Sequence, residues 1–327
     1  MGLDPFAVHG PIAYATAYLD AADGSGERLY LHRWRPTRVP VKAVFALVHG
    51  LGEHAGSYGP FVTYFAARGA AIYAVDNRGF GRSEGRRGHI ARADLYEEDA
   101  LEMVKRARDE QPGVPVVLVG HSMGGTIALM LALDHPALFD LAVFSAPALR
   151  VGAPPPLWQR TLGKTMSRAY PVYTTVRPSN PTLLTRDAML QKETANDTLR
   201  HGRITARLYT EMFVRAPRIV WDRASALSIP FLLLHGEDDP LVPVASSRDL
   251  FSRAVRVREV SALLTYPRLR HELFREVERE EVFRDVAHWL SDHGVLLNER
   301  AAVPAVPGAA LLGQYVGRVR GLARFLP

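Results

Sequence analysis

One pentapeptide limits what this chain can fold into more than any other feature. It reads Gly-His-Ser-Met-Gly at residues 120–124, between the apolar run Val116–Val119 and the small, apolar run Gly125–Ala132. A buried strand, a sharp turn and a buried helix have this order of residues. Glycines flank the turn because the two backbones approach too closely there for a Cβ atom. The bend projects the hydroxyl of Ser122 clear of the sheet, which predicts a nucleophile.

Composition sets the broad class of protein. The 327 residues, 47% of them hydrophobic, allow one large domain with an insert or two domains. The absence of cysteine excludes disulfides, thiolate metal sites and a cysteine nucleophile. The formal net charge is +6, but basic residues are scattered among acidic ones instead of forming a stripe with aromatic residues. We therefore expect no nucleic-acid partner.

No segment predicts export or membrane insertion. The first thirty residues carry acidic side chains and no long apolar core, so we expect no secretory signal. A window of about twenty apolar, uncharged residues, which a spanning helix needs, is also missing. We expect a cytoplasmic protein, with peripheral contact at a membrane surface.

Strand patterns alternate with helix patterns along the chain. This alternation predicts an α/β fold with a mostly parallel sheet and helices on both faces. The predicted strands are Arg28–Trp34, Ala43–Val48, Ala71–Val75, Val116–Val119, Leu141–Phe144, Ile229–Leu234 and the extended run Val257–Thr265. The predicted helices are Tyr58–Arg68, Asp94–Gln111, Ser122–Leu133, Val244–Ala254 and Glu278–Asp292.

An insert interrupts this alternation. We expect residues 1–148 and 229–295 to form the two parts of the core, 149–228 a helical insert and 296–327 a C-terminal tail. The apolar residues of the insert, such as Trp158, Tyr170, Tyr173, Tyr209 and Met212, are predicted mainly as its own core. An insert at this point of the chain also lies near the carboxyl ends of the strands, where ligands bind in open α/β sheets.

The tail has an amphipathic pattern. Ala309–Leu326 places apolar residues at helical spacing, with Arg320 and Arg324 on the opposite face. Such a helix suits a membrane interface. Docking on the domain, packing against another chain and disorder are the alternatives, and three glycines weaken the helix by up to roughly 1 kcal/mol each.

A serine nucleophile needs a base and an acid. A histidine usually takes the proton and a buried carboxylate orients it, and in this architecture the chain order is serine, acid, histidine. Asp238 and Asp239 follow the predicted strand Ile229–Leu234, and either could be the acid or could cap the next helix. His271 lies on a loop after the last extended run and is the predicted base.

The oxyanion of an ester intermediate needs two backbone N–H donors. We expect one from Met123, directly after the nucleophile, and the other from Leu51 in the glycine-containing loop after Ala43–Val48. A third glycine-rich loop, Asp76–Gly85, lacks the third glycine of a dinucleotide-binding pattern. We therefore expect it to be a structural loop at the rim of the site.

Several segments together resemble one known family. Five of them, taken in order, resemble the monoacylglycerol lipase and lysophospholipase family of α/β-hydrolases, and they are His49–Tyr58, Asp76–Gly88, Gly120–Gly125, His235–Pro243 and Tyr266–Glu272. The insert segment Asp197–Ala206 is similar to the cap of that family. The resemblance extends from about Glu27 to Asp292 and leaves out the tail.

The resemblance implies both a fold and an activity. It implies an α/β-hydrolase fold with a hydrophobic cap that admits an acyl chain, and it selects Asp239, the last aspartate of the family's His-Gly-x-x-Asp motif, as the acid. The implied reaction is hydrolysis of an ester with a single acyl chain, such as a monoacylglycerol or lysophospholipid, through an acyl-enzyme on Ser122. It requires no metal or organic cofactor. Phe80 stands where the family more often has histidine, which leaves the polarity of the rim open.

Two other functions remain open at this point. One is hydrolysis of other small esters or amides, or transfer of an acyl group to an alcohol. The other is a hydrolase fold that binds ligands without catalysis, against which the intact set of serine, acid and histidine argues.

Overall fold

The structure is a computed structural model that describes residues 7–9, 11–152, 156–177, 180–295 and 297. The helix predicted over Ala309–Leu326 lies outside these residues.

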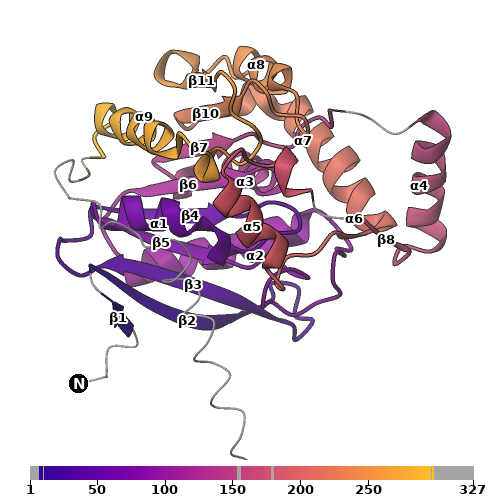
Figure 1. Cartoon of the computed structure of the whole chain (residues 1–327), viewed down its shortest axis with the longest axis horizontal. Helices are drawn as coiled ribbons and strands as arrows, with labels where there is room; N and C mark the ends of the chain where they lie inside the picture. Colours follow the sequence, from indigo (N-terminus) through magenta and orange to yellow (C-terminus); the bar gives the residue numbers. More distant parts are fainter. Residues whose placement is uncertain (1–6, 10, 153–155, 178–179, 296, 298–327) are drawn as a thin grey trace, which may run out of the picture.

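One nine-stranded sheet runs through the described part of the chain, in the order β1-β2-β3-β5-β4-β6-β7-β10-β11 (Figure 1). The strands from β5 to β11 in this order are parallel to one another, whereas β1, β2 and β3 pair antiparallel and β3 pairs antiparallel with β5. The mostly parallel sheet predicted from the sequence is thus confirmed. The strands of this sheet are β1 (Ala7–His9), β2 (Ile12–Asp20), β3 (Arg28–Pro36), β4 (Ala43–Val48), β5 (Ala70–Val75), β6 (Val116–His121), β7 (Leu141–Ser145), β10 (Phe231–Gly236) and β11 (Ala262–Tyr266).

Helices cover both faces of the sheet because alternate side chains of each strand enter two different cores. In β4, Val44 and Ala46 pack in the core that includes α2, α3, α7 and α8, while Phe45 and Leu47 pack in the core that includes α1 and α9. These helices are α1 (Gly59–Ala66), α2 (Asp94–Glu110), α3 (Met123–Asp134), α7 (Ala216–Arg223), α8 (Val244–Arg253) and α9 (Arg279–Asp292).

Three parts of the sheet differ from the prediction, and one of them is the short strand β1, which was not predicted. The prediction of an extended run over Val257–Thr265 was wrong in its first half, where a 3-10 helix at Arg258–Val260 precedes β11. Strand β2 was not predicted, because two of its buried side chains are Ala13 and Ala15, and alanine favours helices. The other core strands and helices end close to the predicted positions.

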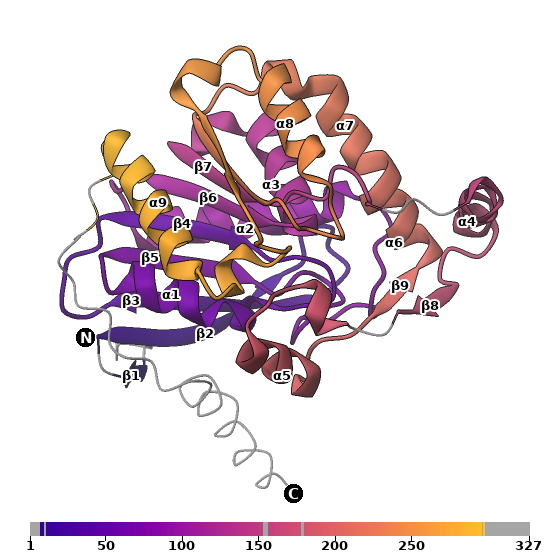
Figure 2. The same cartoon turned by 45° about the horizontal axis from the view of Figure 1, so that its top comes forward.

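The chain between β7 and β10 forms the insert. It contains α4 (Leu157–Ala169), α5 (Ala188–Asn196), α6 (Ala206–Thr210) and α7. A small antiparallel pair of β8 (Thr174–Val176) and β9 (Arg203–Thr205), which the sequence did not reveal, joins its two halves. Helix α4 packs against α6 and lies farthest from the sheet in Figures 1 and 2.

The prediction that apolar residues of the insert form its own core holds only in part. Met212 is fully buried and Tyr209 is partly buried, but both pack in the core between the sheet and helices α2, α3, α7 and α8. Trp158, Tyr170 and Tyr173 remain 65%, 56% and 47% exposed. The region of α4 therefore presents apolar side chains at the surface.

Candidate active site

Ser122 lies on the sharp turn between β6 and α3. Its φ of 53° is in the left-handed region, which costs a residue other than glycine about 1–3 kcal/mol. Two backbone hydrogen bonds hold the turn: the Ser122 N–H donates to the Ser145 carbonyl (3.0 Å), and the Ala148 N–H donates to the Ser122 carbonyl (2.9 Å). The fold thus maintains the strained backbone that lifts the hydroxyl out of the sheet.

Glycines on both sides of Ser122 are required for steric reasons. A Cβ atom at Gly120 would lie 2.6 Å from the Cβ atom of Ala128, and one at Gly124 would lie 2.2 Å from the Val48 carbonyl oxygen. The close approach of strand and helix predicted from the sequence is therefore present.

A chain of hydrogen bonds joins three of the predicted site residues. The Nε2 atom of His271 lies 2.8 Å from the Oγ atom of Ser122, and its Nδ1 atom lies 2.6 Å from Oδ2 of Asp239. The three residues follow β6, β10 and β11, whose carboxyl ends meet at one edge of the parallel sheet. This edge is where open α/β sheets bind ligands.

Of the two candidate acids, Asp239 is the one that contacts the histidine. Its side chain is fully buried, whereas Asp238 is exposed. Its Oδ1 atom accepts the N–H groups of Leu241 (2.8 Å) and Val242 (3.0 Å). Burial opposes ionisation, but the charge of His271 and hydrogen bonds from His235, His271 and the Val242 N–H hold the pKa of Asp239 well below its usual range. Asp239 is therefore a carboxylate at neutral pH.

Two neighbouring histidines have opposite pKa shifts. Burial lowers the pKa of His271, but Asp239 and the nearby glutamates outweigh burial and raise it above 6.5. Burial and the charge of His271 lower the pKa of His121 to about 4. His121 is therefore neutral at pH 7, and His271 is the ring suited to take a proton from Ser122.

The predicted oxyanion donors lie on either side of Ser122. Met123 is the first residue of α3, so its N–H belongs to the first helical turn, which has no acceptor within the helix. The Leu51 loop also lies close, since a Cβ atom on Gly50 would be 3.1 Å from the Cβ atom of Ser122. Among the described residues, neither the Leu51 N–H nor the Met123 N–H has a hydrogen-bond acceptor.

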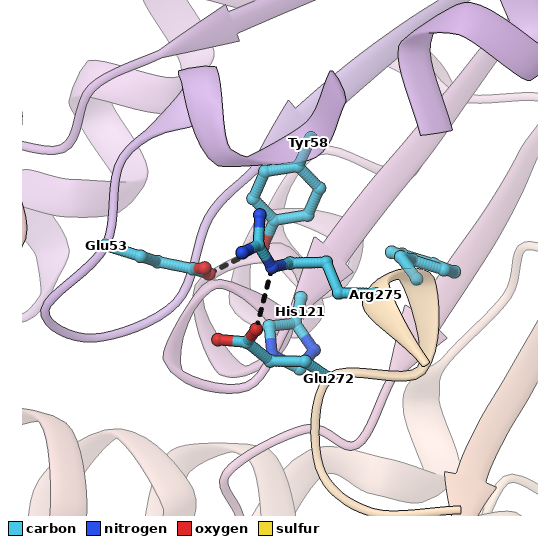
Figure 3. Close-up of a pocket in the computed structure, with 6 residues that line it drawn as sticks. Glu53, Tyr58, His121, Glu272 and Arg275 are labelled. Atoms are coloured by element: carbon cyan, nitrogen blue, oxygen red, sulfur yellow. Dashed lines mark hydrogen bonds and ion pairs between the residues drawn. The ribbon is translucent and has the colours of Figure 1, made fainter. Parts of the chain in front are cut away.

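The sequence did not reveal a buried cluster of charged residues beside this site. A small, partly enclosed cavity of about 10 Å³, about enough for one water molecule, lies within it. Figure 3 shows the lining side chains converging from several segments of the chain. The residues that line the cavity are Glu53, Tyr58, His121, Glu272, Phe274 and Arg275. Glu53 and Glu272 lie inside two of the motifs that carried the family resemblance, but no local pattern indicates that they meet.

Phe80, the departure from the family pattern, does not reach the rim of the site. Its side chain is fully buried, and its ring stacks on His201 of the insert with centroids 4.9 Å apart and planes at 11°. The Nε2 atom of His201 lies 3.0 Å from the Gly79 carbonyl oxygen. The Asp76–Gly85 loop and the insert therefore meet through a covered aromatic pair.

Among the described residues, no group of three or more histidine, aspartate and glutamate side chains is arranged to hold a metal ion. None of the helices in this part of the chain has the length and apolar character that crossing a membrane requires.

Comparisons with known proteins identify relatives of this chain. The family model described as serine aminopeptidase, S33, matches residues 39–278. A monoacylglycerol lipase of Mycolicibacterium smegmatis is 34% identical over 273 residues, which cover 82% of this chain and 94% of the relative. The crystal structure of a monoacylglycerol lipase of Paleococcus ferrophilus matches with a TM-score of 0.71 at 30% identity, covering 81% of this chain and 99% of that one. A soluble variant of monoglyceride lipase from Saccharomyces cerevisiae matches in fold, with a TM-score of 0.75 at 20% identity, covering 85% and 94% of the two chains.

Proposed function

This chain belongs to the serine aminopeptidase S33 family of α/β-hydrolases and is a serine carboxylic-ester hydrolase, and from this premise we propose that it hydrolyses lipids with a single acyl chain, monoacylglycerol first and lysophospholipid second. The observation that carries the proposal is the chain of hydrogen bonds from Ser122 through His271 to Asp239. The 34% identical relative, named a monoacylglycerol lipase, supports the choice of substrate.

Each residue of the hydrogen-bonded chain has a role in acylation. Ser122 attacks the ester carbonyl while Nε2 of His271, 2.8 Å from its Oγ atom, takes the proton. Asp239 keeps the Nδ1 proton on its own side of the ring and stabilises the imidazolium that forms. His271 then gives its proton to the leaving alcohol, so that an acyl-enzyme remains on Ser122.

Deacylation repeats these steps with water. His271 takes a proton from the water molecule, the hydroxide attacks the acyl carbonyl, and the Ser122 oxygen leaves with the proton from His271. In both halves of the reaction, the N–H groups of Leu51 and Met123 stabilise the negative oxygen. Donors of this kind contribute roughly 3–4 kcal/mol each to lowering the barrier.

We assign the binding of the acyl chain to the insert, residues 149–228, which acts as a cap on the two-part core. Apolar side chains exposed on α4 support this assignment, because a long acyl chain needs an apolar surface. An open hollow of about 730 Å³ lies along α4, and its lining residues are Leu157, Trp158, Thr161, Leu162 and Thr165. The residues of the Ser122 site are not among them.

The proposal also includes contact with a lipid surface. Substrates with one long acyl chain partition into membranes, so an enzyme that uses them benefits from binding there. We assign this contact to the tail, on the amphipathic pattern of Ala309–Leu326, in a protein that otherwise works in the cytoplasm.

A substrate panel tests the proposal. It compares p-nitrophenyl esters from acetate to palmitate, a monoacylglycerol, lysophosphatidylcholine and leucine p-nitroanilide, the last as an aminopeptidase substrate. We expect turnover of the monoacylglycerol with the highest kcat/KM and none of the anilide. Preferred turnover of the anilide would contradict the assignment of substrate.

The variant Ser122→Ala tests the assignment of the nucleophile. It should lose ester hydrolysis and covalent labelling by a fluorophosphonate, with an unchanged circular dichroism spectrum. Labelling that persists in this variant would exclude Ser122. Wild-type protein that neither labels nor turns over any ester would instead indicate a fold used only for binding.

A further inference from the structure

The insert lies directly on the loop that carries the Leu51 N–H. Three residues of insert segment 197–201 contact three consecutive residues of that loop, in the opposite chain direction. The contacts are His54 Nε2 to Asp197 Oδ2 (2.8 Å), Arg200 Nη2 to Glu53 Oε2 (2.8 Å), and the His201 N–H to the Gly52 carbonyl oxygen (3.1 Å).

Arg200 also reaches the loop that carries His271. The Nη2 atom that contacts Glu53 lies 3.0 Å from Oε1 of Glu272, the residue next to His271. The Arg200 side chain is only 7% exposed, and both glutamate side chains are 5% exposed. A single buried guanidinium therefore joins three segments: the insert, the loop after β4 and the loop after β11.

Glu53 transmits this contact to the oxyanion loop. Its Oε1 atom accepts the Gly50 N–H at 2.6 Å and the Tyr58 hydroxyl at 2.6 Å. The Gly50 N–H is thereby occupied by Glu53, whereas the following N–H, that of Leu51, has no acceptor among the described residues and remains available to the substrate. The orientation of the Leu51 amide thus depends on where the Glu53 carboxylate is held.

Glu272 transmits the contact to the histidine loop. Its backbone N–H donates to the Leu184 carbonyl of the insert at 2.8 Å, and its Oε2 atom lies 3.0 Å from Nε of Arg275. Burial opposes the ionisation of Glu53 and Glu272, but Arg200, followed by other neighbouring groups, outweighs it, so that the pKa of Glu53 falls to about 2 and that of Glu272 falls below its usual value. Both carboxylates therefore remain charged partners of Arg200.

We propose that Arg200 is a positioning residue for ester hydrolysis, which holds the oxyanion loop through Glu53 and the histidine loop through Glu272 when the insert is seated. The inference rests on the proposed function of this site. Arg200 does not touch the reacting atoms. It makes the geometry of the oxyanion hole and of the base depend on the position of the insert.

Arg200 also contributes a positive charge to the surroundings of His271. The ionisable groups that face this ring, or contact a residue that faces it, include Asp239, His121, Glu53, Glu272, Arg200, Arg275, His235 and Tyr58. Removal of Arg200 leaves the negative charge of two glutamates less balanced, which favours protonated His271. A purely structural role would not change the pH at which His271 loses its proton.

The test measures hydrolysis of p-nitrophenyl butyrate, a short ester, by Arg200→Gln and Arg200→Lys. We expect R200Q to lose about 100-fold in kcat, the scale of a misplaced oxyanion donor, with KM changed by less than about threefold because binding in the ground state is retained. The acid limb of its pH profile should move to higher pH. R200K keeps the charge but cannot hold two carboxylates as a planar guanidinium does. Its kcat should therefore be about tenfold higher than that of R200Q, and its acid limb should lie at the wild-type pH.

The matched control is Arg215→Gln. Arg215 also joins the insert to the core, with Nη2 3.0 Å from Asp94 Oδ2 on α2, but it lies outside the site. R215Q should keep wild-type kcat and acid limb. If R200Q behaves like R215Q, the inference is wrong while the proposed function stands. Turnover that persists in Ser122→Ala would overturn the proposed function instead.

Folding is checked by thermal unfolding and circular dichroism. If R200Q does not fold, the kcat of R200K tests the inference instead, because the lysine ammonium keeps a positive charge beside the two buried glutamates. A folded R200K with kcat at least about fivefold below wild type and unchanged KM supports the inference. A folded R200K with wild-type kcat overturns it.

Discussion

Oδ2 of Asp239 lies 2.6 Å from Nδ1 of His271, although 32 residues separate the two in the chain. This contact places the Nδ1 proton between the ring and the carboxylate, so the lone pair of Nε2 faces Ser122. Asp239 is itself held by the N–H groups of Leu241 and Val242. The turn after β10 therefore sets both the tautomer and the charge of His271.

The acid limb of kcat/KM should lie above pH 6.5 in the wild-type enzyme. His271 acts as a base only when it is neutral, and Asp239 raises its pKa above 6.5, so activity rises as pH increases through this raised value. Asp239→Asn removes the charge, so its acid limb should move to lower pH while kcat falls by about 10⁴-fold because the tautomer is no longer fixed. Rates measured from pH 5 to 9 with p-nitrophenyl butyrate check both shifts. A wild-type limb below 6.5, or the same limb in D239N, would contradict the role of Asp239.

Gly124→Ala should damage both stability and activity. A Cβ atom there meets the carbonyl oxygens of Val48 and His49 at 2.2 and 2.4 Å, and backbone at the end of β4 must move to make room. Because the loop with Leu51 follows this point, we expect a loss of about 2–3 kcal/mol in the free energy of unfolding and at least about a tenfold loss of kcat. Urea unfolding and ester hydrolysis measure the two effects.

Gly163→Ala is the matched control for this prediction. Gly163 lies in α4, where an added Cβ atom would come no closer than 3.9 Å to the Tyr209 side chain. Alanine there should raise stability by up to about 1 kcal/mol and leave kcat unchanged. Equal behaviour of the two variants would show that the close contact at Gly124 does not matter.

Phe80→His, which introduces the residue more common in the family, should lower stability with little effect on kcat. Phe80 is fully buried against His201 and lies apart from the Ser122 hydrogen-bond chain. A polar ring without a partner there costs about 1–3 kcal/mol. Phe80→Leu keeps the site apolar and should lose less. Thermal unfolding of both variants tests this, and a wild-type melting temperature for F80H would mean that the new ring finds a hydrogen-bond partner.

The parts predictable from the sequence are those that local patterns determine. The turn at Ser122 requires glycines on both sides, and each buried parallel strand requires a continuous apolar run, so both are visible in short windows. The choice between the two candidate acids could not be made from a short stretch of sequence, because Asp238 and Asp239 have the same local chemistry. The family resemblance selected Asp239, and the position of His271 in three dimensions agrees, because its ring contacts Asp239.

The charged cluster was not predictable because its members meet across the whole chain. Arg200 and Glu53 are 147 residues apart, and Arg200 and Glu272 are 72 apart. Buried charges also look like surface charges in the sequence, since each is normally solvated unless a partner covers it. The exposed Trp158 shows the opposite error, as an apolar residue predicted for a core lies at the surface.

Deletion of the residues after Ala301 should weaken binding to anionic vesicles. The sequence pattern of the deleted segment predicts Arg320 and Arg324 opposite an apolar helical face, and each basic side chain near an anionic surface contributes about 1 kcal/mol. Loss of these two arginines alone corresponds to about a 30-fold loss of partitioning, and the deletion, which also removes Arg318 and the apolar residues, should lose at least this much in co-sedimentation with vesicles of phosphatidylglycerol and phosphatidylcholine. The deletion should leave hydrolysis of p-nitrophenyl butyrate unchanged, because the described core holds the whole Ser122 site. Arg320→Gln combined with Arg324→Gln separates the two contributions: it should lose binding to anionic vesicles but retain the apolar part, whereas unchanged binding by the deletion would exclude the tail as the membrane contact.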